Sequence, residues 1–284
     1  MTSVRNWIYV WLVLTGLWAC EERIELDIEQ VPDGYVIDGL LTNQFKQHYV
    51  RIKKMVDFYD TARTPDVKNA RVVVLDNIGN VYDYSWSSDQ GAYFSNVKFS
   101  GVVGSVYRME VELDGLIFHA VDSMRPISDI TEVTWTLDAY EEENPQKEGY
   151  FYQALLTTVE PQETKDYYLF KIYRNDTIQR FDDNSGVFVT DDIAIGEIIK
   201  NLPAPVYFAI DDWGKFETYS LTPEAFKYYF DLSQILNNDG GMFGGVPANP
   251  VSNIVGEGGL GFFQVSAVAS DSVQIGDPDK EASF

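Results

Sequence analysis

The chain has 284 residues, with 44 Asp and Glu against 21 Lys and Arg, so its formal net charge at pH 7 is −23. A polyanion of this kind is repelled by phosphate backbones and anionic head groups, which disfavours nucleic acid as a partner and membrane binding through a basic patch. The chain has only 1 cysteine, so no intrachain disulfide can form.

Residues 1–19 have the pattern of an export signal. Arg5 supplies a positive start, and the apolar run Trp7–Gly16 has about half the length needed to span a bilayer. Ala19 is a small residue before Cys20. The pattern resembles a bacterial lipobox, in which the cysteine becomes the acylated first residue of the mature chain. We expect lipidation at Cys20; the alternatives are an ordinary signal peptide or a tail-less membrane anchor.

An acidic tether, residues 20–30, follows the signal and contains Glu21, Glu22 and Glu25. It resembles the export tag that sends Bacteroidota lipoproteins to the cell surface. The alternative is a solvated linker without a sorting role. The favoured location is therefore the outer membrane with the protein lipid-anchored and surface-exposed, and the alternative is its periplasmic face.

Residues 31–126 alternate short runs rich in Val, Ile and Tyr with clusters of Gly, Asn and Asp, which is typical of antiparallel strands. Strands are expected at Tyr35–Thr42, Tyr49–Val56, Arg71–Asp76, Val81–Trp86, Val106–Leu113 and Leu116–Val121. Asp114-Gly115 predicts a tight turn that pairs the last two. The succession Ala70–Asp76, Gly79, Asp89–Tyr93 resembles the transthyretin-like and carboxypeptidase-regulatory class of Ig-like sandwiches.

Residues 127–284 are predicted to form a second antiparallel β unit with one helix, so the whole chain is expected to be mainly β. Strands are expected at Ile130–Leu137, Tyr150–Val159, Tyr167–Arg174, Val206–Ile210 and Leu260–Val268, and a loop with solvated glutamates at Ala139–Gly149. The helix is expected at Pro223–Leu236, because Thr222 can cap it and proline suits its first position. Its face with Phe226, Tyr229, Phe230 and Leu236 is expected to pack on the sheet.

The glycine-rich stretch after this helix contains a Pro-x-Asn-x-x-x-Asn-Ile pattern, Pro247–Ile254, and a Leu-Gly-Phe-Phe strand starts at Leu260. Helix, loop and strand in this order resemble the C-terminal half of a Bacteroidota family of unknown function, number 4249, whose members are outer-membrane lipoproteins. The resemblance implies an accessory role beside a TonB-dependent transporter and supplies no catalytic residues.

Residues typical of catalysis or metal binding are sparse. His48 and His119, the only histidines, are placed in predicted strands and have no partner at metal-ligand spacing. A nucleophile elbow and a glycine-rich nucleotide loop are also absent from the sequence. The acidic stretch Asp182–Gly186 with Asp191 and Asp192 favours solvated turns over a calcium loop. We expect no enzyme activity, no cofactor and no metal.

Exposed glycine-rich loops on a β scaffold often carry binding function. We therefore expect the segment Asp239–Glu257 to contact a partner or ligand through Met242, Phe243, Pro247, Asn249 and Asn253. The alternative is an ordered cover over the end of the second sheet. In that case the two asparagines would hydrogen-bond the backbone.

Four Asp-Ser/Thr tripeptides resemble the O-glycosylation acceptor of exported Bacteroidota proteins. Their hydroxyl residues are Thr61, Ser123, Thr177 and Ser272.

Three functions remain open. The favoured one is a non-catalytic surface lipoprotein that binds a ligand or hands it to a TonB-dependent transporter. The others are an envelope adhesion or assembly module that binds another envelope protein, and a hydrolase whose site the sequence does not reveal.

Overall fold

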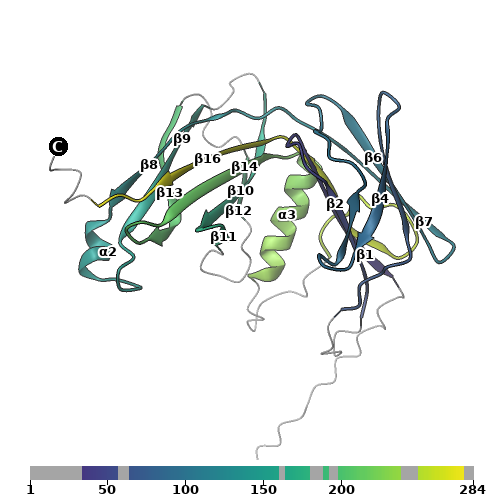
Figure 1. The fold of residues 1–284 in the computed structure, drawn as a ribbon, viewed down its shortest axis with the longest axis horizontal. Helices are drawn as coiled ribbons and strands as arrows, with labels where there is room; N and C mark the ends of the chain where they lie inside the picture. The colour runs from purple at the N-terminus through teal and green to yellow at the C-terminus, as the bar shows by residue number, and fades with distance from the viewer. Residues whose placement is uncertain are drawn as a thin grey trace, which may run out of the picture. The chain divides into compact units, whose positions relative to one another are not determined.

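The computed structural model describes residues 34–56, 64–159, 164–179, 188–191, 198–237 and 249–277. This part of the chain is mainly β, as expected, with strands in three sheets and the helices α2 and α3 (Figure 1). Neither of these helices is long and apolar enough to cross a bilayer.

The first sheet is 8-stranded, in the order β15-β1-β2-β5-β4-β3-β6-β7. Its strands are β1 (Tyr35–Thr42), β2 (Tyr49–Lys54), β3 (Arg71–Asp76), β4 (Val81–Ser87), β5 (Ala92–Ser95), β6 (Val106–Leu113), β7 (Leu116–Ser123) and β15 (Gly259–Ser266). Buried and exposed positions alternate along β6 and β7, so one face of each strand points into an apolar core. The core is centred on large side chains such as Tyr107, Phe118 and Phe263.

The predicted hairpin at Asp114-Gly115 is confirmed. Both residues have positive φ, 49° and 80°, as a two-residue turn between twisted strands requires. β6 and β7 pair antiparallel on either side of it, with Leu113 opposite Leu116.

β15 lies in the first sheet, although the sequence prediction placed this strand in the C-terminal unit. It pairs in parallel with β1, with Tyr35 opposite Gly259 and Thr42 opposite Ser266. β2 occupies the other edge of β1, so the free backbone groups on this edge need a partner strand. β15, which is distant in sequence, is this partner strand. The first sheet therefore includes residues from both sides of the expected boundary at residue 126.

The second and third sheets share one core. The second follows the order β11-β10-β14-β16, with β12 also paired to β10, and the third follows β13-β9-β8. The strands are β8 (Ile130–Leu137), β9 (Tyr152–Val159), β10 (Tyr167–Arg174), β11 (Thr177–Ile178), β12 (Phe188–Asp191), β13 (Ile198–Phe208), β14 (Trp213–Ser220) and β16 (Val268–Gln274). Their shared core contains Leu156, Phe170, Phe208 and Phe216.

Helix α3 (Pro223–Leu236) begins and ends where the sequence predicted. The Thr222 hydroxyl accepts a hydrogen bond from the backbone N–H of Ala225, which caps the first turn. Phe226 and Tyr229 pack against the apolar cluster that joins α3 to β10 and β15. The predicted packing face is wrong in part, because Phe230 and Leu236 are 47% and 41% exposed.

The expected loop Ala139–Gly149 is wrong at its start, where the structure has the short helix α2 (Ala139–Glu143). The Asp138 carboxylate accepts hydrogen bonds from the backbone N–H groups of Tyr140 and Glu141, which caps this single turn. Glu141 was expected to be solvated, but it is only 2% exposed. Its carboxylate accepts a hydrogen bond from the backbone N–H of Gln146, which holds the loop after α2.

Candidate functional site

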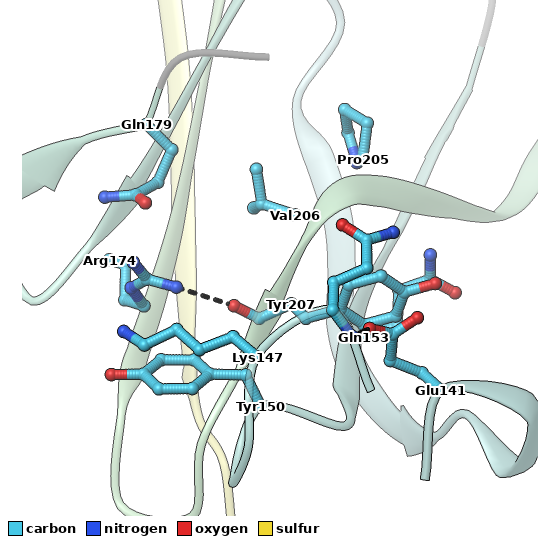
Figure 2. Close-up of a pocket in the computed structure, with 10 residues that line it drawn as sticks. Glu141, Lys147, Tyr150, Gln153, Arg174, Gln179, Pro205, Val206 and Tyr207 are labelled. Carbon is cyan, nitrogen blue, oxygen red and sulfur yellow. Dashed lines mark hydrogen bonds between the residues drawn. The ribbon is translucent and has the colours of Figure 1, made fainter. Parts of the chain in front are cut away.

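A cavity of about 340 Å³ opens beside the third sheet, between the loop that follows α2 and the end of β10 (Figure 2). Ten residues line it: Glu141, Gln146, Lys147, Tyr150, Gln153, Arg174, Gln179, Pro205, Val206 and Tyr207. Its volume suits a small organic ligand. Because the walls come from segments far apart in the sequence, the cavity exists only in the folded chain.

Two cations lie against one aromatic ring of this cavity. The ammonium of Lys147 is 3.7 Å from the ring centroid of Tyr150, and the guanidinium carbon of Arg174 is 4.7 Å from it. Both distances are within the range of cation–π attraction. Figure 2 shows Lys147, Tyr150 and Arg174 together on one side of the cavity. A chain with a strong negative charge thus has a local pair of cations here.

A chain of hydrogen bonds fixes the wall behind these cations. Arg174 Nη1 donates to the backbone carbonyl of Tyr207 at 2.8 Å, and the Tyr207 hydroxyl donates to Asp138 Oδ2 at 3.1 Å. Burial raises the pKa of Tyr207, and the neighbouring Asp138 carboxylate raises it further. Tyr207 therefore stays a neutral donor, and the cap of α2 is connected to the cavity.

Side-chain amides supply the remaining polar lining. Gln153 Nε2 donates to the carbonyl of Ala204 at 3.2 Å, and Gln179 Nε2 donates to the carbonyl of Thr177 at 2.8 Å. These bonds orient the two amides and leave their carbonyl oxygens with acceptor capacity. Ser, Cys and His are absent from the ten lining residues, so the polar groups of this wall are amides, phenols, cations and one carboxylate.

The residues that the sequence singled out fall partly outside and partly inside the described ranges. Eight of them, Cys20, Glu21, Glu22, Glu25, Thr61, Met242, Phe243 and Pro247, are outside the described residues. The acidic stretch Asp182–Gly186, for which solvated turns were expected in preference to a calcium loop, also lies outside them. Lipidation, the export tag and most of the proposed partner loop therefore stay predictions.

The two asparagines of the expected partner loop differ in their surroundings. Asn249 is exposed. Asn253 uses its side-chain amide on the backbone: Oδ1 accepts from Phe263 N at 2.9 Å, while Nδ2 donates to Phe263 O at 2.9 Å and to Val121 O at 3.3 Å. Asn253 thus bridges β7 and β15. Hydrogen bonds from its amide to the backbone are what the ordered-cover alternative predicted.

Three of the candidate glycosylation residues are described. Thr177 and Ser272 are exposed, in β11 and β16, whereas Ser123 is half-buried at the end of β7. Ser123 lies between the buried residues Asp122 and Met124. The two exposed hydroxyls are the better placed for a bulky modification.

The structure places the two histidines as follows. His48 lies just before β2, outside the strand expected to contain it, and is completely buried. Its Nδ1 accepts from the Thr42 N–H and its Nε2 donates to Phe99 O, while burial lowers its pKa to about 4. His119 lies in β7, as expected. The described part of the chain contains no group of three or more metal-ligating side chains.

Sequence reasoning missed the cavity because its residues carry no motif. Tyr150 begins the expected strand Tyr150–Val159, Gln153 lies within it, and Arg174 ends the expected strand Tyr167–Arg174. Such residues are typical of strands with one face in solvent. The only local signal was the charged loop before Tyr150, where a lysine follows the glutamates.

Comparison with known proteins assigns the chain to a family. No curated protein sequence matches the chain. The family model described as "Domain of unknown function (DUF4249)" matches residues 21–272, from directly after Cys20 to within β16. Since the match covers most of the chain, the protein belongs to the DUF4249 family.

Proposed function

We propose that this protein is a non-catalytic ligand-binding lipoprotein that serves as the accessory partner of a TonB-dependent transporter. The observation that carries the binding role is the cavity of about 340 Å³ with its cations, amides and tyrosine rings. Donors and acceptors there are mixed, and the Tyr150 ring supplies an apolar surface. A small ligand with many hydroxyl groups, such as a saccharide, uses all of these features.

The proposed location follows from the start of the chain. Cys20 would carry the lipid, and Glu21, Glu22 and Glu25 would direct the protein to the surface of the outer membrane. The resemblance to Bacteroidota outer-membrane lipoproteins supports this location and the transporter as partner. The alternative is a protein that faces the periplasm, and protease digestion of intact cells distinguishes the two orientations.

Ligand binding is tested with a panel of mono- and disaccharides, scored by the shift in thermal unfolding of the purified protein. Tyr150→Ala removes the ring that both cations contact. Tyr140→Ala is the matched control, because Tyr140 is 73% exposed in α2 and does not line the cavity. We expect at least one saccharide to raise the melting temperature of the unmodified protein and of Tyr140→Ala, with the effect lost in Tyr150→Ala. Equal shifts of the melting temperature in both variants would mean that the saccharide does not bind in this cavity.

The partner is tested by purification from outer membranes with an affinity tag after Phe284. We expect stoichiometric recovery of a transporter barrel. Recovery of structural or matrix proteins alone would favour the second candidate function.

That second candidate is an envelope adhesion or assembly module, and one observation favours it. The outer face of β7 exposes Ile117 by 65% and Val121 by 49%, and Val255 beside them is 56% exposed. The backbone N–H of His119 donates to the Val255 carbonyl at 2.9 Å, which places Val255 next to this strand. Clustered exposed apolar side chains are typical of protein contact surfaces.

A further inference from the structure

One face of the second sheet changes character along its length. Leu169 lies opposite Tyr219 in the pairing of β10 with β14, and both belong to the apolar cluster that α3 covers. Two and four residues further along β10, the same face carries Lys171 and Tyr173. Their partners across the strands are Glu217 and Lys215. The sheet face under α3 therefore continues into a polar cluster.

Glu217 is the centre of this cluster and is only 7% exposed. Its Oε1 accepts from Lys215 Nζ at 2.7 Å. Its Oε2 accepts from the Tyr173 hydroxyl at 3.0 Å and from the Tyr219 hydroxyl at 2.7 Å. The negative charge of Glu217 is thus already neutralised by Lys215.

Lys171 lies directly across from Glu217 but forms no ion pair with it. Its ammonium is 4.4 Å from the ring centroid of Tyr219, and among the described residues it makes neither a hydrogen bond nor an ion pair. The side chain is half-buried. A partly desolvated ammonium without a carboxylate is unfavourable, so its presence calls for a physical reason.

Lys46, Tyr49 and Tyr228 supply further donors. Lys46, also half-buried, donates to Gln44 Oε1 at 2.6 Å and has no carboxylate partner within the described ranges. Within the same ranges, the half-buried Tyr49 and Tyr228 make ring contacts, and their hydroxyls form no hydrogen bond.

These groups meet where β1 approaches β10 and β14. Tyr49 and Tyr228 pack against the apolar cluster that contains Tyr219, and the ammonium of Lys171 lies over the Tyr219 ring. Burial lowers the pKa of Lys171; the carboxylates of Glu217 and Asp38 oppose this effect and Lys46 adds to it. Burial likewise raises the pKa of Tyr49, and Asp38, Tyr173 and Tyr228 raise it further.

The charge balance of the region is positive. Asp38 is paired with Arg51 at 3.4 Å, and Glu217 is paired with Lys215 at 2.7 Å. Among the residues that the structure describes, Lys46 and Lys171 have no carboxylate at ion-pair distance. The cluster also reaches solvent, because the side chains of Arg51 and Lys215 are 40% and 38% exposed. An incoming anion would supply the missing acceptor.

We propose that Lys171 and Lys46, with the hydroxyls of Tyr49 and Tyr228, bind an oxyanion, a carboxylate or phosphate group carried by a small ligand. Ammonium and phenol groups are donors that suit such an oxyanion. The site is distinct from the cavity of Figure 2, since Lys171 and the cavity residue Arg174 are three positions apart on β10 and point to opposite faces. It does not depend on the function proposed for that cavity.

Calorimetric titration tests the proposal with two probes, inorganic phosphate and glucuronate, each against sodium chloride at equal ionic strength. The two probes distinguish a phosphate from a carboxylate group. We expect saturable binding of at least one probe, weakened about tenfold or more in Lys171→Met. Lys98→Met is the control, because Lys98 is exposed and the exchange removes the same charge. It should leave binding unchanged.

A second measurement uses the unmodified protein and is independent of how the variant folds. Limited acetylation followed by mass spectrometry reports the reactivity of each lysine. The bound probe should protect Lys171 and Lys46 and leave Lys98 reactive. Absence of saturable binding for both probes would overturn the proposal, as would binding that leaves Lys171 unprotected and persists in Lys171→Met.

Discussion

The carboxylate of Asp122 accepts a hydrogen bond from the backbone N–H of Val265 at 2.7 Å, which joins the end of β7 to β15. Its other oxygen accepts from the Thr222 hydroxyl at 2.9 Å and from the Ser123 N–H at 2.9 Å. Since Thr222 caps α3, one buried carboxylate fastens two strands of the first sheet to the start of the helix.

The burial of Asp122 makes the free energy of unfolding depend on pH. Burial raises the pKa of Asp122 from 3.8 to about 7, although hydrogen bonds from Val265, Thr222 and Ser123 act in the opposite direction. A folded-state pKa above the unfolded one means that the native state favours the protonated acid. The stabilisation is complete below about pH 4 and is lost as the pH rises to about 7.

The test is urea unfolding of the unmodified protein and Asp122→Asn across this range. The free energy of unfolding of the unmodified protein should fall relative to the variant by up to about 4 kcal/mol between pH 4 and pH 7. Taking the difference removes the contribution of the other carboxylates. A difference that does not change with pH would show that Asp122 titrates normally.

Gly261 is predicted to be intolerant of a side chain. It has a φ of 106°, and a Cβ there would overlap the backbone carbonyl of Ile37 on the paired strand β1. Gly79 is a matched control, with a φ of 97° and no atom within 4 Å of its Cβ position. We expect Gly79→Ala to lower the free energy of unfolding by about 1–2 kcal/mol through backbone strain alone.

Gly261→Ala should cost at least about 2 kcal/mol more, because β1 and β15 must also move apart. Chemical denaturation of the two variants measures the difference. Similar costs would mean that the β1–β15 pairing adjusts without strain.

Asn253 and Asn249 are predicted to differ when each is changed to alanine. Asn253→Ala leaves the N–H and carbonyl of the buried Phe263 without their side-chain partner, so we expect a loss of about 2–3 kcal/mol. Asn249 is exposed, so Asn249→Ala should stay within about 0.5 kcal/mol. Thermal unfolding checks both, alongside transporter co-purification. If Asn253→Ala lowers the melting temperature and the remaining folded protein still recovers the partner, Asn253 has only a structural role.

Lipid attachment is predicted to depend on Cys20. Cys20→Ala should release the protein from membranes, because acyl chains contribute about 0.8 kcal/mol per buried CH₂. Incorporation of a radioactive fatty acid is the readout. Labelling that survives the substitution would place the lipid elsewhere.

Surface display is predicted to depend on the acidic tether. Changing Glu21, Glu22 and Glu25 to alanine should leave the protein acylated but protected from protease added to intact cells. Undiminished digestion of this triple variant would mean that the charges serve only as a solvated linker.

The sequence by itself determined the elements whose signals are local. The β6–β7 hairpin follows from Asp114-Gly115 between alternating strands, and α3 follows from Thr222, Pro223 and the run to Leu236. Turn conformation, capping and side-chain periodicity depend on a few neighbouring residues, so they can be read directly from the chain. The mainly β class and the family resemblance rest on the same local patterns.

Only the tertiary structure decided which distant segments meet. The parallel pairing of β15 with β1 joins residues more than two hundred positions apart, and the wall of the cavity brings Lys147 and Arg174 to one ring. Lys171 looks like an ordinary strand residue until the sheet places it across from a glutamate that Lys215 has already neutralised. Strand order and long-range register depend on burial and on the satisfaction of backbone groups across the whole fold, and no local pattern encodes these.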